Sequence, residues 1–178
     1  MKKILVLSSS PRRGGNSDLL CDQFVQGAQE AGHAVEKIFL RDRHIGYCTG
    51  CYTCVKTRGI CAQKDDMSEI LEKILQADVL VLGTPVYFYC MSAQLKTVID
   101  RCVARYTQIQ NKEAYLIAAA GENDRKAFDG TITAFRGYLD CLENVREAGM
   151  VLAQGVPLKG EVAHTAYMQQ AYELGRNA

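Results

Sequence analysis

The sequence predicts an α/β fold in which a parallel sheet carries helices on both faces, and three observations support this. Five short segments are rich in apolar, β-favouring residues, as is typical of strands buried on both faces. Five segments with apolar residues at helical spacing alternate with them. No repeat or long linker interrupts the 178 residues, so we expect a single domain spanning residues 1–178.

The first half of the chain supplies two strands and two helices. Ile4–Leu7 is a wholly apolar strand, and Ser17 can cap the helix that follows it. The second strand is expected at Ala34–Leu40. Asp66 and Glu69 form a capping box of the D-x-x-E kind, which predicts that the second helix begins there.

The second half continues the alternation. "DVLVLGTP" predicts a third buried strand at residues 78–85, and Ser92 can cap the next helix. "AYLIAAAG" predicts a fourth strand at residues 114–121. The remaining expected elements are a helix at 128–142, a weaker strand at 145–152 and a helix at 161–174. In such sheets ligands bind beyond the carboxyl ends of the strands, so the loops after strands one, three and four are the candidate sites.

Composition narrows the function classes. Apolar residues make up 48% and charged residues 23%, and the net charge is +1. A nucleic-acid binder usually has an excess of basic residues, and an electron carrier that docks on basic partners usually has a strongly acidic surface. The net charge of this chain fits neither class. No apolar run approaches the roughly 18 residues of a membrane span, and the first apolar stretch is too short for a signal peptide. We therefore expect a cytoplasmic protein with reduced thiols, no membrane partner and no nucleic-acid partner.

The loop after the first strand, "SSSPRRGGNSD", has the chemistry of a phosphate site. Backbone N–H groups at a helix start, hydroxyl donors and arginines can together bind an anion. The loop contains neither G-x-G-x-x-G nor G-x-x-x-x-G-K-[ST], so the common dinucleotide and triphosphate motifs are absent. A Ser- and Gly-rich turn before a capped helix would explain the same residues. The candidate phosphate ligands are Ser8, Ser9, Ser10, Arg12, Asn16 and Ser17.

Two segments carry a family resemblance. "SSSPRRGGNS" resembles the phosphate loop of the flavodoxin-like NAD(P)H-dependent FMN reductases, and "GTPVYFYCMSAQLKTVIDR" resembles the turn and helix that follow strand three in that family. Both lie at the correct ends of strands and in the correct order. The resemblance implies a flavodoxin-like three-layer sandwich with a five-stranded parallel sheet in the order 2-1-3-4-5, and FMN as the cofactor.

The second segment suits the flavin ring. Its aromatic residues provide rigid apolar surface, and backbone N–H groups can stabilise negative charge on the reduced ring. Two small residues after the fourth strand leave room beside it. A hydrophobic loop packed inward is the competing interpretation. The candidate ring ligands are Pro85, Val86, Tyr87, Phe88, Ala120 and Gly121.

Four of the eight cysteines lie in the stretch 48–61, with the spacing C-x2-C-x2-C-x6-C. A C-x2-C-x2-C run supplies three thiolates to a [4Fe–4S] cluster from one tight loop, and a further cysteine completes the set. Structural zinc usually takes two separated pairs, and disulfides conflict with a reducing compartment. Unligated cysteines are the remaining alternative. The candidate ligands are Cys48, Cys51, Cys54 and Cys61, whereas Cys21, Cys90, Cys102 and Cys141 are expected to be packing residues.

With the flavin loops, this motif is similar to that of the iron–sulfur flavoproteins of anaerobic microbes. That resemblance implies an FMN-dependent oxidoreductase relaying electrons between a [4Fe–4S] cluster and FMN, with no side chain required as an acid. It also implies a ferredoxin-like or NAD(P)H donor, a small-molecule acceptor, and homodimers or homotetramers. Two alternatives stay open, an NAD(P)H-dependent FMN or quinone reductase without a cluster and a flavodoxin-type carrier.

Overall fold

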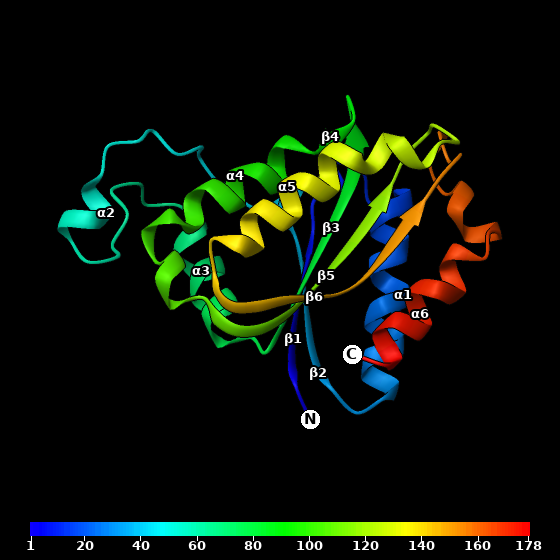
Figure 1. Cartoon of the computed structure of the whole chain (residues 1–178), viewed down its shortest axis with the longest axis horizontal. Helices are drawn as coiled ribbons and strands as arrows, with labels where there is room; N and C mark the ends of the chain where they lie inside the picture. Colours follow the sequence, from blue (N-terminus) through cyan, green and yellow to red (C-terminus); the bar gives the residue numbers. More distant parts are fainter.

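Six strands form the sheet at the centre of the computed structural model, which describes residues 1–178 (Figure 1). Five of them are parallel, in the order β2-β1-β3-β5-β6, and β4 pairs antiparallel with the end of β3. The strands are β1 (Lys3–Ser8), β2 (Ala34–Phe39), β3 (Val79–Tyr87), β4 (Cys90–Met91), β5 (Gln110–Ala119) and β6 (Glu143–Ala153). The α/β architecture with a parallel sheet is confirmed.

The expected number of five strands is wrong by one, because β4 was missed. The order of the five long strands agrees with the expected order. β4 has only two residues and is joined to β3 by the turn Phe88–Tyr89, in which both residues have positive φ. Such turns are normally signalled by Asn or Gly, and the aromatic pair here gives no such signal.

The chain forms six α-helices, and all of them except α2 pack on the sheet. They are α1 (Asn16–Glu30), α2 (Thr53–Lys56), α3 (Met67–Gln76), α4 (Ala93–Arg101), α5 (Asp129–Asp140) and α6 (Tyr167–Arg176). The helix expected at 161–174 is divided into a 3-10 turn, Glu161–His164, and α6. α2 lies within the stretch expected to be wholly loop. None of these helices is both long enough and apolar enough to cross a membrane.

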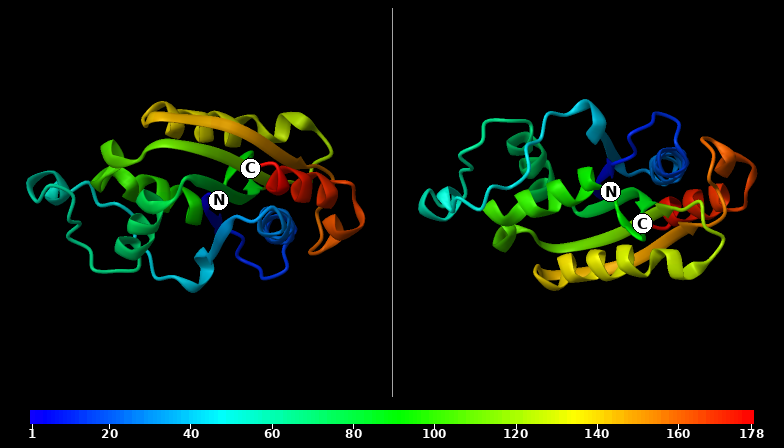
Figure 2. Two further views of the ribbon diagram at one scale, coloured as in Figure 1. Left: turned by 90° about the horizontal axis from the view of Figure 1, so that it is seen from below. Right: turned by 90° about the horizontal axis from the view of Figure 1, so that it is seen from above.

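Alternation along β1 separates the two faces of the sheet. Ile4 and Val6 pack with the cluster that contains α1 and α6, whereas Leu5 and Leu7 pack with the cluster that contains α3, α4 and α5. Each of these side chains is at most 2% exposed, and full burial of such a side chain contributes about 1.5–3 kcal/mol. Three layers result, with helices on both faces of the sheet, as the two views of Figure 2 show.

The helix starts test the expected caps. Ser92 does cap α4, because its hydroxyl accepts from the backbone N–H of Leu95. The cap at Ser17 is wrong, since α1 begins one residue earlier and Gly15 precedes it. The capping box at Asp66 is also wrong. The carboxylate that accepts from the first N–H of α3, that of Met67, belongs to Asp65.

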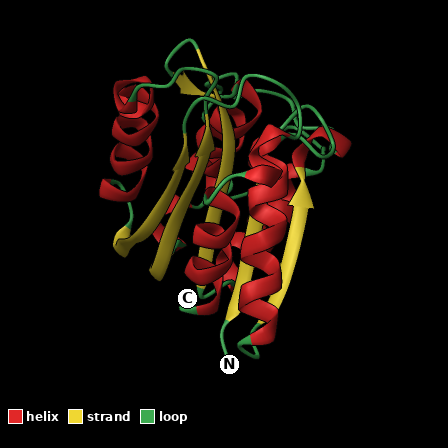
Figure 3. Ribbon diagram, turned by 90° about the vertical axis from the view of Figure 1, so that its right-hand side faces the viewer, coloured by secondary structure: helices red, strands yellow, loops and turns green.

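The loops that follow the parallel strands gather at the carboxyl ends of these strands, and both chain termini lie toward the opposite ends (Figure 3). A long excursion between β2 and α3, residues 47–64, projects to one side of the molecule with α2 near its tip (Figure 1). It contains the closely spaced cysteines and is called the cysteine loop below. The sheet therefore places the β1–α1 loop beside the end of β3, while the cysteine loop lies apart from them.

Candidate flavin and cysteine sites

Asp18 organises the β1–α1 loop from the first turn of α1. Its buried carboxylate accepts from the Ser8 hydroxyl (2.8 Å) and the Gly14 backbone N–H (2.9 Å), and it pairs with Lys37 (2.6 Å). Burial opposes ionisation of this carboxyl, but the hydrogen bonds from Lys37, Ser8 and Gly14 outweigh it, so the pKa of Asp18 lies below its usual value. A charged, buried carboxylate thus fixes the curl of the loop. Sequence reasoning did not assign Asp18 this role.

The start of α1 presents backbone donors that the protein itself does not use. The N–H groups of Asn16, Ser17 and Asp18 donate to no backbone acceptor, because the helical ladder begins with Leu19 donating to Gly15. Open N–H groups at a helix N-terminus, together with the helix dipole, favour an anion. The hydroxyl of Ser17 is also absent from the hydrogen bonds that shape the loop.

The serines of β1 and its loop are used within the protein. Ser9 donates to the Gly83 carbonyl (2.8 Å) and accepts from the Ser92 hydroxyl (2.8 Å), which ties β1 to β3 and to the start of α4. Ser10 donates to the carbonyl of Arg12 (2.9 Å). With Ser8 bound to Asp18, these three hydroxyls shape the turn, and a ligand would meet mainly its backbone.

Asn16 also faces the protein with its side chain. Its amide donates to the carbonyls of Val156 (2.7 Å) and Leu158 (2.8 Å), and its oxygen accepts from Val162 N–H (3.3 Å). The expected side-chain donation to phosphate would require these bonds to break. In this arrangement the backbone N–H of Asn16 is the group available to an anion.

Three basic residues surround the loop. Arg13 lies over the ring of Phe39 (4.8 Å to the centroid) and pairs with Asp42, so its charge is already partly balanced. Arg12 is exposed and forms no ion pair. Lys159 lies close to Gly14, with its Cε 3.6 Å from the place of a Cβ there. Sequence reasoning missed Lys159 because 145 residues separate it from the loop it approaches.

The β3–β4 hairpin borders a cleft of about 530 Å³ with the loop after β5. Tyr87, Phe88 and Tyr89 are exposed, and Phe88 completely so. The cleft is lined by Val86, Tyr87, Phe88, Tyr89, Ala120, Gly121, Glu122, Ala127 and Pro157. Five of the six predicted ring ligands therefore meet at one place. The sixth, Pro85, lies within β3 opposite Ala119 and does not line the cleft.

The hairpin turn is held in an unfavourable conformation. Phe88 and Tyr89 have φ of 48° and 61°, the left-handed region that bulky residues rarely adopt. The carbonyl of Tyr89 packs so closely on α5 that a Cβ at Gly130 would overlap it. Strain of this kind is typical of binding sites, and here it exposes aromatic surface beside the cleft.

All four cysteines of the cysteine loop line a single cleft of about 360 Å³. Cys48 and Cys51 are exposed, and Cys54 and Cys61 are partly exposed. No set of three or more His, Cys, Asp or Glu side chains lies close enough to hold a metal ion. The pKa of Cys51 is lowered to about 7, chiefly by its hydrogen bond with Thr53, which favours the reactive thiolate.

The other cysteines divide into two kinds. Cys21 and Cys102 are buried, and burial raises the pKa of their thiols to about 12 and about 11. The sulfur of Cys21 occupies the place where a Cβ at Gly83 would lie, which packs α1 tightly on β3. The packing role is confirmed for these two. Cys90 and Cys141 are exposed, so the expectation of packing is wrong for them.

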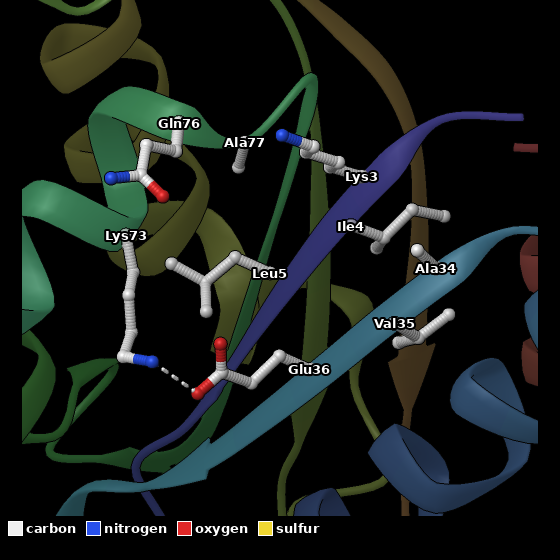
Figure 4. Close-up of a pocket in the computed structure, with 9 residues that line it drawn as sticks. All are labelled: Lys3, Ile4, Leu5, Ala34, Val35, Glu36, Lys73, Gln76 and Ala77. Carbon is white, nitrogen blue, oxygen red and sulfur yellow. Dashed lines mark hydrogen bonds and ion pairs between the residues drawn. The ribbon is translucent and has the colours of Figure 1, made fainter.

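A further cleft, of about 310 Å³, lies away from these loops between the beginnings of β1 and β2 and the end of α3 (Figure 4). Its lining is mostly aliphatic, and its charged side chains include the ion pair of Lys73 with Glu36 (2.7 Å). It contains no cysteine or histidine. Its position toward the amino-terminal ends of the strands is opposite to that at which such sheets bind ligands.

A family model described as NADPH-dependent FMN reductase matches residues 2–163. The chain belongs to the NADPH-dependent FMN reductase family. Its members are flavin-dependent oxidoreductases. The expected family is thereby confirmed.

Individual relatives agree with this family. An iron-sulfur flavoprotein of Archaeoglobus fulgidus is 40% identical over 101 residues, 57% of this chain and 45% of its own length. An FMN-dependent NADH:quinone oxidoreductase of Pseudoalteromonas atlantica is 26% identical over 195 residues, 98% of this chain and 96% of its own. The structure of an FMN-dependent NADH-azoreductase of Bacillus anthracis in complex with FMN has a TM-score of 0.73 at 20% identity, over 99% of this chain and 97% of that one.

The residues present suit the cofactor of the FMN reductase family. The open N–H groups at Asn16, Ser17 and Asp18 would suit a phosphate, and the hairpin cleft would offer an apolar wall to a flat ring. Gly121 borders the same cleft, and a Cβ there would lie 3.3 Å from Pro157. The fit therefore rests on a backbone cradle and an aromatic wall.

Proposed function

We propose that this member of the FMN reductase family is an iron–sulfur flavoprotein, in which electrons pass between a [4Fe–4S] cluster and FMN. The observation that carries the proposal is that four thiols of one loop line one cleft in a chain built to hold FMN. The chain spans about half the length of the first curated iron-sulfur flavoproteins that it matches. Activity, donor and acceptor are therefore proposed here from the site itself.

FMN, when bound, supplies both one-electron and two-electron chemistry. Backbone N–H groups of Asn16 and Ser17 would hold its phosphate, and Arg12 and Lys159 would balance the charge. The other proposed ligands are Ser8, Ser9 and Ser10 through the backbone of their turn, and Val86, Tyr87, Phe88, Ala120 and Gly121 around the ring. Pro85, which lies in β3 outside the cleft, is no longer proposed as a ring ligand. Their task is orientation and exclusion of water, because the side chains that line the cleft need not move a proton.

Cys48, Cys51, Cys54 and Cys61 would hold the cluster, which supplies single-electron transfer. The chemistry of the donor set suits it, since four thiols border one concavity and Arg101 in its wall carries a positive charge. Gly50 and Gly59 have φ of 65° and 113°, so the loop already turns sharply between the cysteines. The four thiols are not gathered around one point in the structure, so cluster binding would draw them together across the cleft that they line.

A second candidate function is an NAD(P)H-dependent FMN or quinone reductase without a cluster. The similarity to the FMN-dependent NADH:quinone oxidoreductase, which extends over 98% of this chain, favours it. In either case we propose NAD(P)H or a ferredoxin-like protein as donor and a small molecule such as a quinone as acceptor. We also propose a homodimer or homotetramer, to be measured by sedimentation.

Purification without oxygen, followed by counts of iron and acid-labile sulfide per FMN, tests the cluster. We expect about four of each, since a cubane with four cysteine ligands has that composition. Cys51→Ser should remove most of the iron and spare FMN, whereas Cys141→Ser, an exposed cysteine outside the loop, should change neither. Flavin without iron in the wild type would instead favour the second candidate.

The donor is tested by mixing the protein with NADH, NADPH or reduced ferredoxin and following flavin absorbance. Bleaching by a pyridine nucleotide identifies a reductase, and bleaching only by ferredoxin identifies the relay. A preparation that binds no FMN in excess would contradict both candidate functions.

A further inference from the structure

The cysteine loop is closed at its base by hydrogen bonds between its two ends. The Asp65 carboxylate accepts from Gly46 N–H (2.9 Å), and the Asp66 carboxylate accepts from His44 N–H (2.7 Å). Asp66 N–H donates back to the His44 carbonyl (3.0 Å). The loop is thus a segment with a fixed base, as in Ω-loops, and the cysteines lie beyond that base.

Arg101, the last residue of α4, lies at the centre of this base. Its guanidinium donates twice to Asp65 (2.7 and 3.0 Å) and once to the Gly46 carbonyl (2.6 Å). The side chains of Arg101 and Asp65 are 2% and 5% exposed. A bidentate pair with so little exposure has one well-defined geometry, so the guanidinium is held rigidly against the loop.

The same guanidinium reaches one of the four thiols. Nη2 of Arg101 donates to the sulfur of Cys61 at 3.4 Å. The other hydrogen bonds of the four cysteines are made within the loop, between Gly50 and Cys48 and between Cys51 and Thr53. Arg101 is therefore the side chain from outside the loop that donates a hydrogen bond to one of the four thiols.

Arg101 has a further donor available. Its Nε–H is buried and has no acceptor in the protein. An unpartnered buried N–H is unfavourable, and an additional acceptor would remove that cost. Arg101 also lines the cleft of the four cysteines, so its positive charge borders that cleft.

We propose that Arg101 is a positioning residue for the proposed cluster. Arg101 would seat Cys61 as the fourth ligand and raise the reduction potential of the bound cluster. The proposal rests on the cluster of the proposed function. Hydrogen bonds to sulfur and a nearby positive charge both stabilise the more negative, reduced form of such a cluster. Because Arg101 is paired with Asp65, the reduction potential of the cluster depends on the positive charge of Arg101 and on the negative charge of Asp65.

The test compares four variants with the wild type, all purified without oxygen. Arg101→Gln removes the charge, Arg101→Lys keeps it but loses the bidentate geometry, and Asp65→Asn removes the opposing charge. Arg105→Gln is the matched control, because Arg105 borders the neighbouring cleft on the same side but its side chain pairs with Glu72 and forms no hydrogen bond with a cysteine. The readouts are iron retention against a chelator, the midpoint potential of the cluster, FMN content and melting temperature.

We expect Arg101→Gln to keep its FMN, to lose iron about 10- to 100-fold faster and to have a more negative midpoint potential. Arg101→Lys should lie between this variant and the wild type. Asp65→Asn should shift the potential in the positive direction, and Arg105→Gln should match the wild type. An electrostatic effect shifts the midpoint potentials of Arg101→Gln and Asp65→Asn in opposite directions. Damage to the loop base would shift both potentials in the same direction.

Several results would overturn the proposal. They are wild-type potential and iron retention in Arg101→Gln, a shift of the same sign in Asp65→Asn, an equal shift in Arg105→Gln, or loss of FMN from both Arg101 variants. A wild-type protein that holds FMN but no iron would refute the cluster itself. Iron in the wild type with no response to Arg101 refutes only the role of this residue, so the two failures are distinguishable.

Discussion

Asn16 links the start of the first helix to the last part of the chain. Three hydrogen bonds of its side chain join the β1–α1 loop to Val156, Leu158 and Val162. The residue is 6% exposed, so water could replace these bonds only in part. The Asn16 side chain thereby holds Lys159 close to the β1–α1 loop. The effect of the Asn16 side chain on a bound phosphate would be indirect.

Asn16→Ala should destabilise the protein even without FMN. It leaves two carbonyls and one N–H without their partners, and each unsatisfied buried group costs about 1–3 kcal/mol. Partial access to water should limit the total to about 2–4 kcal/mol in the free energy of unfolding, measured by denaturant titration of the FMN-free protein. Ser17→Ala is the control and should change this stability by less than about 1 kcal/mol. Equal stability of Asn16→Ala and the wild type would contradict the bracing role.

At the scale of elements, the β3–β4 hairpin combines strain with exposure. Two aromatic residues occupy the positions where Asn-Gly is usual, and one of them is fully exposed. Left-handed backbone costs about 1–2 kcal/mol for an ordinary residue. The retention of aromatic side chains at this cost is what a ring-binding wall would require.

Replacing both turn residues, Phe88→Asn with Tyr89→Gly, should relieve the strain and remove the aromatic wall. We expect the FMN-free protein to gain about 1–2 kcal/mol in unfolding free energy. FMN affinity should fall at the same time, as measured by fluorescence titration. Loss of stability would show that the aromatic pair is needed for packing, and unchanged affinity would remove the hairpin from the flavin site.

The sequence predicted the long elements well because their apolar patterns are produced by burial. All five long strands and the helices of both layers fall close to their expected ranges. The apolar runs around Val6 and Val81, for example, are fully buried strands. Local signals were less reliable. Asp65, and not Asp66, accepts from the start of α3, because Asp66 is engaged with His44. Neighbouring carboxylates cannot be distinguished by spacing when tertiary partners decide.

The candidate site also has a part that the sequence predicted and a part that it did not. Motifs identified the two loops and the cysteines, since these are contiguous in sequence. Lys159 and Arg101 were missed as site residues, because each acts through contacts formed only when distant segments meet. Asp18 was missed although Ser8 and Gly14 lie in the same loop, because spacing alone does not show which way its carboxylate faces. The side-chain roles of Ser8 to Ser10 were not predictable for the same reason. A hydroxyl in a turn can serve the ligand or the turn, and only its partners decide.

At the scale of the whole molecule, a bound cofactor would join elements from across the chain. The cradle and cleft together involve β1, α1, β3, the loop after β5 and the segment after β6. A ligand that binds only the folded state stabilises it by about 2.7 kcal/mol at 100 times its Kd. The phosphate end and the ring end should both contribute.

FMN in such excess should raise the melting temperature by about 5–10 °C, the shift that this free energy produces in a protein of this size. Riboflavin at the same concentration should raise it less, because it lacks the phosphate for which the start of α1 is suited. Thermal melts monitored by circular dichroism measure both. Equal shifts with the two compounds would remove the β1–α1 loop from the binding site.

The helix α4 connects two regions that would otherwise be independent. At one end Ser92 bonds to Ser9 of the β1–α1 loop, and at the other Arg101 holds the base of the cysteine loop. Its nine residues span about 14 Å at about 1.5 Å each, and one inserted residue would turn one end by about 100° relative to the other. A change in the length of α4 would therefore misplace the base of the cysteine loop relative to the β1–α1 loop, even if both loops kept their own sequences.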